Sequence, residues 1–366
     1  MALLDEPGPL PRLLFVSGTP SSVRQGSGTY VGISLLCRAL QARGCVVDTI
    51  APANGPATLA RRVEFNLGRR HMDLSHYDAW VGFDLDGLFV RQGRGEHAPL
   101  HVAAIKGVLA EEKRFERGWT RLSLGVQAWL EARHARQASL VLAPSAYAAA
   151  ALRYRYRVPE SRLRVVAEPI DLAAWRRRLE EAPRRRRGEP TILCVAHLYP
   201  RKDVATLLRA FARLQPPAQL RIVGDGPEMG RLQRLARKLG LGERCRLLGH
   251  LPFADLAAEY ANADLFCLPS RQEAFGIVLL EAMAAGLPIL AARAAAIPEV
   301  VPEGDCGWLF PAGDEAGLAA ALERLLAEPA ARGRMGEAGR RHVRRFDAPA
   351  VAEAFLRVLV AAGPRG

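Results

Sequence analysis

The sequence lacks an apolar run of the roughly 20 residues that a membrane-spanning helix requires. It begins Met-Ala-Leu-Leu-Asp-Glu-Pro, without the basic segment and following apolar segment that mark a secretory signal. We therefore expect a protein that stays in the cytoplasm.

Patterns typical of disulfide and metal sites are also missing. The six cysteines are scattered through apolar segments and form neither a CxxC pair nor a zinc-like spacing with histidine. We interpret them as reduced thiols in the core. One DxD pair, Asp84 and Asp86, is of a type that can hold a divalent cation, but no other ligand cluster accompanies it. We favour a loop-end pair without a metal.

Acidic residues are few relative to basic ones, with 38 Asp and Glu against 51 Lys and Arg, for a formal charge of +13. Such a surface attracts anions, which include nucleotides, nucleic acids and lipid headgroups. The interleaved aromatic and basic residues of nucleic-acid modules are not seen, so no nucleic-acid partner is expected. Peripheral contact with the inner face of an anionic membrane stays open, as does a simple compositional preference for arginine.

Strand and helix patterns alternate along the chain, whose 366 residues suffice for two domains. A strand over 12–17, a helix over 29–43 and a strand over 46–50 form an expected βαβ opening. Further strands are predicted at 78–83, 101–105, 140–143, 164–166, 191–196, 219–223, 244–247, 263–268 and 287–291. This alternation is typical of parallel sheets that helices cover on both faces. Between the halves, residues 175–190 hold seven arginines, and we expect a solvated linker there, with a phosphate or lipid-headgroup contact as the alternative.

The most informative stretch, residues 269–288, contains two carboxylates, and the segment between them is apolar apart from Gly276. Glu273 follows a predicted strand, and Glu281 lies inside the helix that starts near Phe275 and Gly276. At helical rise the two lie about 12 Å apart, farther than the about 5–9.5 Å between paired glycosidase carboxylates. We therefore expect them to hold opposite ends of one long ligand, with the amides of the helix N-terminus offered to an anion between them. The alternative is that Glu281 pairs with a buried arginine and Glu273 caps the helix.

Two other segments carry residues suited to phosphate. Arg201 and Lys202 follow the predicted strand 191–196, and the carboxyl ends of strands in open α/β sheets are where ligands bind. They could neutralise a diphosphate, or they are ordinary surface charges. Gly26 and Gly28 follow the first strand and open a helix, which suits close approach of backbone to phosphate, but a flexible loop fits equally well. Residues 223–227, Val-Gly-Asp-Gly-Pro, are interpreted as a tight turn.

Taken together, these segments resemble the retaining GT-B glycosyltransferases of family 4, also called glycosyl transferases group 1. The resemblance rests on residues 199–203, 222–228, 269–288 and 304–314, which follow one another in this order; it is dense over 191–325 and looser before that. It implies an α/β protein with two Rossmann-like parallel-sheet domains facing a cleft. The implied parts are an acceptor-side domain (1–172), an arginine-rich linker (173–190), a donor domain (191–347) and a C-terminal helix that packs back on the first domain (348–366).

The resemblance also implies roles for the site residues. Glu273 would contact the sugar hydroxyls of a nucleotide-diphosphate sugar and Glu281 its ribose hydroxyls. Sugar and phosphate would also meet the backbone amides of Ala274, Phe275, Gly276 and Ile277. Arg201 and Lys202 would hold the diphosphate, over which the loop of Gly26 and Gly28 would close.

The reaction implied by the resemblance is hexosyl transfer with retention, without a metal or other cofactor. The acceptor hydroxyl, on a sugar, a lipid-linked molecule or a small molecule, would attack from the face that the phosphate leaves, and the departing phosphate would take the proton. Catalysis would then rest on positioning and charge stabilisation.

The chain departs from the pattern of the family at three places. His197, after Ala196, stands where many members have Arg after Gly; Lys106 stands where many have His; and Glu168-Pro169 stands where Asn-Gly is commoner. We include His197 and Lys106 among the substrate-binding candidates. The alternatives are a GT-B sugar-nucleotide epimerase, which needs carboxylates placed for proton abstraction, and a basic anion- or membrane-binding protein without catalysis.

Overall fold

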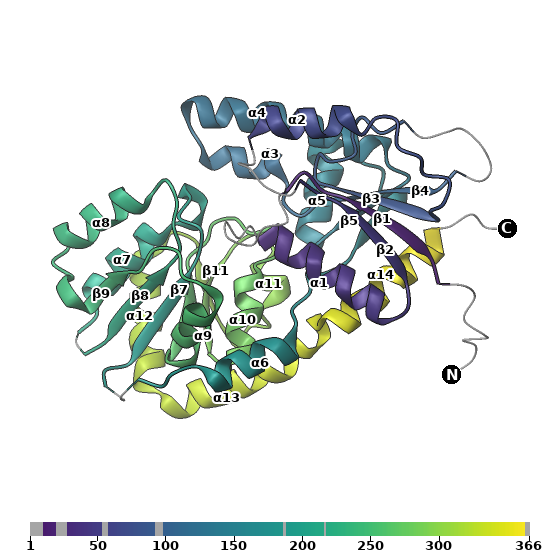
Figure 1. Ribbon diagram of the computed structural model, residues 1–366. Coiled ribbons are helices and arrows are strands. Elements are labelled where there is room, and N and C mark those ends of the chain that lie inside the picture. The colour runs from purple at the N-terminus through teal and green to yellow at the C-terminus, as the bar shows by residue number, and fades with distance from the viewer. Residues whose placement is uncertain are drawn as a thin grey trace. The chain divides into compact units, whose positions relative to one another are not determined.

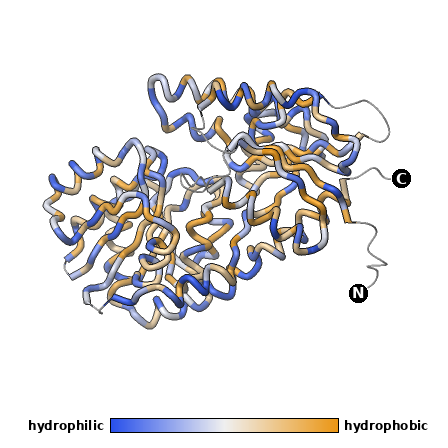
Figure 2. The backbone as a smooth tube through the Cα atoms, in the orientation of Figure 1, coloured by the Kyte–Doolittle hydropathy of each residue, from blue (hydrophilic) through white to orange (hydrophobic). Residues whose placement is uncertain are grey.

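The computed structural model describes residues 10–19, 28–52, 58–91, 98–185, 188–215 and 217–362. The chain divides into two compact units, unit 1 (Met1–Pro169 with Ala348–Gly366) and unit 2 (Ile170–Asp347). Each unit is built on one six-stranded sheet in which every pairing is parallel (Figure 1). Apolar segments run along the strands of both sheets (Figure 2), as helices on both faces require. The predicted α/β class is confirmed.

The sheet of unit 1 has the strand order β2-β1-β3-β4-β5-β6. In chain order its strands are β1 Arg12–Val16, β2 Val46–Ile50, β3 Ala79–Phe83, β4 Leu100–Ala104, β5 Leu140–Ala143 and β6 Leu163–Val165. The helices are α1 Gly28–Ala42, α2 Leu59–Gly68, α3 Leu109–Glu112, α4 Gly118–Gln137, α5 Ala146–Tyr156 and α14 Ala348–Ala362, with 3-10 turns η2 Lys113–Phe115 and η3 Glu160–Arg162.

The last helix completes the core of unit 1. α14 packs along α1, and its Phe355 meets Phe15 of β1 edge to face, with ring centroids 6.2 Å apart. Phe355 is buried in the same apolar cluster as the inner residues of β1 and β3. Some 180 residues of chain thus separate this helix from the rest of the core that it covers.

The sheet of unit 2 has the order β12-β11-β10-β7-β8-β9. Its strands are β7 Thr191–Val195, β8 Gln219–Val223, β9 Cys245–Leu247, β10 Leu265–Leu268, β11 Ile289–Arg293 and β12 Gly307–Pro311. The first five match the predicted strands within two residues at each end, whereas β12, bounded by glycine and proline, was not predicted. The helices are α6 Leu172–Glu181, α7 Val204–Arg213, α8 Met229–Lys238, α9 Phe253–Ala261, α10 Ile277–Ala285, α11 Ile297–Val300, α12 Glu315–Ala327 and α13 Pro329–His342, with 3-10 turns η4 Pro200–Lys202, η5 Gly242–Arg244 and η6 Val343–Phe346.

The expected linker at 173–190 differs from the observed structure, because it begins inside α6. The side chain of Asp171 caps this helix by accepting a hydrogen bond from the Ala174 amide at 2.9 Å. Trp175 and Leu179 share one helix face and are buried against α9 and α10. The apolar stripe among the arginines therefore makes this segment part of unit 2 rather than a solvated connection.

The strand order reverses once in each sheet, beside β1 in unit 1 and beside β7 in unit 2. β1 lies between β2 and β3, and β7 lies between β8 and β10. At such a switch point the loops that leave two neighbouring strands diverge to opposite faces, which opens a crevice at the carboxyl ends where open α/β sheets bind ligands.

Candidate functional site

The loops that follow β7 and β10 lie side by side in unit 2. The two strands are parallel neighbours, with Leu265 opposite Ile192. The loops themselves are joined where the Arg271 amide donates to the Arg201 carbonyl at 2.8 Å. The two predicted segments therefore meet at the switch point.

An ion pair joins the predicted residues Lys202 and Glu273. Lys202 Nζ lies 2.6 Å from Glu273 Oε1, although the residues are 71 positions apart, and both side chains are largely buried. Burial by itself would raise the pKa of Glu273, but the nearby charges of Lys202 and Arg201 outweigh it and hold the pKa below its usual value. The carboxylate is therefore an anion that keeps a lysine in place.

Asp203 orients the loop that carries Lys202. Its backbone has φ 46°, a left-handed conformation that Asp tolerates better than most residues. Its Oδ2 accepts hydrogen bonds from Arg271 Nε at 2.8 Å and from Thr206 Oγ1 at 2.9 Å. The sequence alone assigned no role to Asp203. Its place directly after Arg201 and Lys202, where the loop meets helix α7, could have indicated that it orients these cations.

Helix α10 begins directly after these loops. Its first residue, Ile277, follows Gly276, whose φ of 97° favours glycine. In the part of the chain that the structure describes, the N-cap residue Gly276 makes no side-chain capping hydrogen bond. The first turn, with Ala274 and Phe275 just before it, therefore presents backbone amides and the positive end of the helix dipole next to Lys202 and Glu273.

Glu281 lies in the second turn of α10 and accepts a hydrogen bond from the hydroxyl of Tyr260 at 2.8 Å. Burial raises the pKa of Glu281 to about 7, and the Tyr260 hydrogen bond opposes part of this shift. Among the described residues no ion pair reaches Glu281. The alternative that it pairs with a buried arginine is therefore wrong for the described part of the chain.

Two aromatic residues that sequence reasoning missed support Glu281. Trp175 of α6 donates from Nε1 to the Glu281 carbonyl at 3.0 Å, and its ring meets Tyr260 of α9 edge to face at 5.4 Å. Nothing in the local pattern of either helix connects it to α10, so only the packing of three helices reveals this contact.

The glycine turn after β8 supports the segment that holds His197 and Arg201. Gly224 and Gly226 have φ of 130° and 156°, and a Cβ on Gly224 would lie 1.9 Å from the Ala196 carbonyl oxygen. The Leu198 amide donates to the Asp225 carbonyl at 2.9 Å. The prediction of a tight turn is confirmed. His197 is exposed, and the guanidinium of Arg201 lies over the Tyr199 ring at 5.4 Å.

Lys106 and Glu168, two of the departures from the family pattern, pair with each other in unit 1. Lys106 Nζ contacts both carboxylate oxygens of Glu168, at 2.8 and 3.0 Å, and both side chains are largely buried. A Cβ on Gly32 of α1 would lie 2.4 Å from Glu168 Oε2, so the glycine leaves room for the acid. These two departures from the family pattern are therefore partners in one ion pair, and Lys106 meets its counter-charge within unit 1.

The DxD pair is an anchor within the loop after β3. Asp86 is fully buried and accepts from Arg62 Nη2 at 2.8 Å, from Asn66 Nδ2 at 2.9 Å and from the Gly18 amide at 2.6 Å. Asp84 accepts from the Lys106 amide at 2.9 Å. These bonds tie together the ends of β1, β3 and β4, and no group of metal-ligating side chains occurs in the described ranges.

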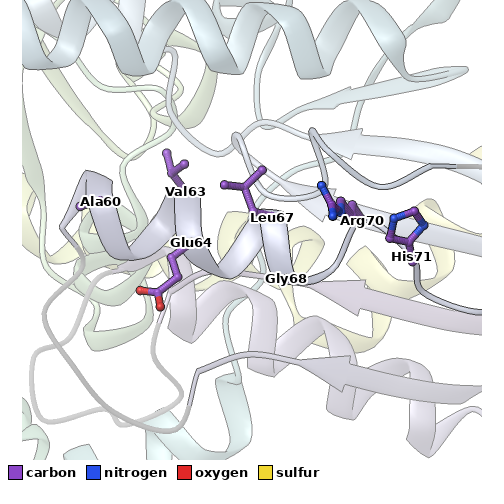
Figure 3. Close-up of a pocket in the computed structure, with 7 residues that line it drawn as sticks. All are labelled: Ala60, Val63, Glu64, Leu67, Gly68, Arg70 and His71. Carbon is purple, nitrogen blue, oxygen red and sulfur yellow. The ribbon is translucent and has the colours of Figure 1, made fainter.

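The predicted glycine loop is only partly described. Gly26 lies outside the described residues, and Gly28 is the first residue of α1. Figure 3 shows an open groove along α2, where Val63 and Leu67 lie on one side of the helix and Glu64 on the other. No predicted site residue lines this groove, so it is not the candidate site.

Residues 176–342 match the model of the family described as glycosyl transferases group 1. Over this segment, which lies within unit 2, the chain is similar to members of that family. It is similar to a GDP-mannose-dependent alpha-(1-6)-phosphatidylinositol monomannoside mannosyltransferase of Mycolicibacterium smegmatis, at 38% identity over 41% of this chain and 42% of the relative. It is also similar to an MMP alpha-(1->4)-mannosyltransferase of Mycolicibacterium hassiacum, at 34% identity over 61% of this chain and 55% of the relative. The chain thus spans about half the length of these relatives.

Solved structures extend the likeness over nearly the whole chain. Sucrose-phosphate synthase from Thermosynechococcus elongatus matches with a TM-score of 0.78 and 24% identity, over 96% of this chain and 100% of that one. Anabaena HepE in complex with UDP matches with a TM-score of 0.70 and 19% identity, over the same shares. At this identity the likeness establishes the fold, and the predicted GT-B class with two Rossmann-like units is confirmed.

Proposed function

We propose that this protein transfers a sugar from a nucleotide-diphosphate sugar to an acceptor hydroxyl. The observation that carries the proposal is the Lys202–Glu273 pair at the adjoining carboxyl ends of β7 and β10, beside the N-terminus of α10. Cations, an acid and a helix dipole at one switch point suit a ligand with an anionic middle and a hydroxyl-rich end. The names of the curated relatives, which are glycosyltransferases, support the same reaction class.

We assign the diphosphate to Lys202 and Arg201, with the amides of Ala274, Phe275, Gly276 and Ile277 at phosphate and sugar. Glu273 holds Lys202 in place, so the lysine loses little conformational freedom when the donor binds. The same ionised carboxylate accepts hydrogen bonds from sugar hydroxyls. His197, exposed in the loop after β7, is assigned to the donor as well.

We assign the ribose to Glu281. Tyr260 donates to its Oε2, and Oε1 accepts from a ribose hydroxyl. The ionised form is the better acceptor, so this contact strengthens as pH rises through about 7.

The proposed transfer retains the anomeric configuration. The acceptor hydroxyl attacks from the face that the phosphate leaves, the bond from the anomeric carbon to the phosphate oxygen breaks, and the departing phosphate receives the hydroxyl proton. Lys202 and Arg201 stabilise the charge that develops on the leaving group, a task that protein cations can perform without a metal. The acceptor is a sugar, a lipid-linked molecule or a small molecule. The unpaired cysteines fit a reducing compartment, and we place the reaction in the cytoplasm.

A thermal-shift panel of UDP-, GDP-, ADP- and dTDP-sugars tests the proposal, because a ligand that binds only the native state raises the melting temperature. We expect one donor class to raise it in the wild type and not in Lys202→Ala. The effective donor is then incubated with candidate acceptors, with and without EDTA, and the anomeric configuration of the product is read by NMR.

Three results would contradict parts of the proposal. The absence of any shift would remove the donor assignment. An inverted product would remove same-face attack. Activity lost in EDTA and restored by Mn²⁺ would remove metal independence.

A further inference from the structure

Helix α4 exposes four large apolar side chains in a line. Their spacing of three, four and three residues places them on one helix face. Their exposed fractions are 82% for Trp119, 64% for Leu122, 52% for Val126 and 58% for Trp129. We call these four residues the α4 face.

The α4 face is unlike the rest of the surface that the structure describes. The other exposed large apolar residues, Leu10, Val46, Leu67, Tyr154, Val165, Tyr199 and Val360, lie singly on separate elements. Isolated exposed apolar residues are normal, whereas a contiguous group marks an interaction site.

The first half of α4 extends beyond the core of unit 1. None of residues 118–127 is buried, whereas the second half contributes Ala128, Ala132 and Ala135 to the apolar cluster under β4 and β5. Figure 1 shows α4 along the outside of this unit. The exposed aromatic residues are therefore not needed to hold the helix in place.

The charges that α4 exposes are all positive. Arg121, Arg133 and Arg136 are exposed, and Arg117 precedes the helix. The one acid in the helix, Glu131, is buried, and it accepts from the Leu109 amide at 3.1 Å and from the Tyr156 hydroxyl. Glu116, before the helix, is only partly exposed.

This charge distribution decides between occupants. A second copy of the chain laid against the α4 face would bring arginine against arginine, which is unfavourable. Lipid phosphates attract the arginines, and tryptophan rings prefer the boundary between headgroups and acyl chains.

We propose that the α4 face docks on an anionic lipid surface. Trp119, Leu122, Val126 and Trp129 enter the interface, and the flanking arginines contact headgroup phosphates. Of the arginines in residues 175–190, Arg185 pairs with Glu259 inside unit 2 and is not counted among these headgroup contacts. The proposal does not depend on the transferase activity, because binding to vesicles is measured without donor or acceptor.

The test is co-sedimentation of the full chain with phosphatidylcholine vesicles and with equimolar phosphatidylglycerol–phosphatidylcholine vesicles. We expect binding to the anionic vesicles only. The double variant Trp119→Gln/Trp129→Gln should bind at least ~10-fold more weakly, since two large apolar side chains leave the interface. Arg121→Gln should weaken binding roughly fivefold, as one interfacial cation is lost. Tyr154→Gln, which changes an equally exposed aromatic residue of the same unit, serves as the control and should bind like the wild type.

Brominated lipids give a second readout. Trp80 and Trp175 are buried, and Trp308 of unit 2 is half-buried beneath the Arg324 guanidinium, so strong quenching of tryptophan fluorescence on vesicle binding is expected from Trp119 and Trp129. Unchanged binding of the double variant, with a far-UV spectrum that shows it folded, would overturn the proposal. Equal binding to neutral and anionic vesicles would also overturn it. So would a wild-type dimer that becomes a monomer in the double variant, because this result would assign the α4 face to a second copy of the chain.

Discussion

The two units share one design but use a lysine–glutamate pair differently. In each, a largely buried pair lies at the carboxyl edge of a six-stranded parallel sheet, Lys202–Glu273 in unit 2 and Lys106–Glu168 in unit 1. In unit 2 the lysine contacts one carboxylate oxygen and has Arg201 and the N-terminus of α10 beside it. In unit 1 the lysine contacts both oxygens of its acid and also lies over the Phe83 ring.

The difference indicates how to distinguish a binding site from a structural contact. At the site in unit 2, the three cations Arg201, Lys202 and Arg271 face two acids, Glu273 and Asp203, and the N-terminus of α10 adds its dipole, a combination that favours an anionic ligand. Unit 1 has one lysine and one acid matched within the pair. We therefore propose that the same residue types at the same edge of the same fold serve different purposes, and that the surrounding charges decide which.

The largest expected effect tests whether the Lys106–Glu168 pair stabilises the folded protein. Lys106→Met should destabilise the protein by about 3–5 kcal/mol, because it leaves Glu168 buried without a counter-charge. The double variant Lys106→Met/Glu168→Gln should recover part of that loss. Urea unfolding of the wild type, the two single variants Lys106→Met and Glu168→Gln, and the double variant measures the coupling. Additive changes in the free energy of unfolding would show that the pair is not coupled.

The second effect tests whether Lys202 takes part in the proposed sugar transfer. Lys202→Ala should lower turnover by about 10² or more, as lost stabilisation of leaving-group charge predicts. Lys106→Met is the matched control, and it should keep the donor-induced thermal shift that Lys202→Ala loses. Loss of the shift in both variants would break the distinction between the two pairs.

A smaller effect is expected at Glu281. Glu281→Ala should weaken binding of the nucleoside diphosphate about tenfold, since one charged hydrogen bond is lost. Tyr260→Phe keeps the carboxylate and should weaken binding less. Isothermal titration of the two variants separates the roles, and an affinity for Glu281→Ala equal to that of the wild type would remove the ribose assignment.

The last effect is a gradual slope of stability with pH, which is small within any one pH unit. Because the folded pKa of Glu281 is about 7 against an ordinary 4.5, the folded chain retains a proton that the unfolded chain has released between these values. Its contribution to stability is therefore present below pH 4.5 and falls as pH rises toward 7, by at most about 1.4 kcal/mol per pH unit. Glu281→Gln should lack this fall. Parallel unfolding curves of variant and wild type across the range would show that the pKa is not raised.

Much of the fold was accessible from local patterns. Short β-branched and apolar runs separated by amphipathic segments predicted β1–β11, because burial on both faces leaves a continuous apolar signature. Segment 173–190 was mispredicted because seven arginines concealed Trp175 and Leu179, which share one face of α6. β12 was missed because its ends, Gly307 and Pro311, are turn residues as often as strand residues.

Much of the candidate site was also visible in the sequence, but its partners were not. Glu273, Glu281, Arg201 and Lys202 stood out because charges beside apolar strands and helices require an explanation. Tyr260, Trp175 and Asp203 did not, because their roles arise from contacts between elements that local spacing does not specify.

The sequence by itself determined the alternation of strands and helices and the position of each charge relative to its own strand, because these depend on neighbours a few residues away. The tertiary structure alone decided that Lys202 meets Glu273, that Lys106 meets Glu168, and that α14 joins a core formed at the other end of the chain. These contacts depend on strand order and helix packing, which join residues far apart in the sequence.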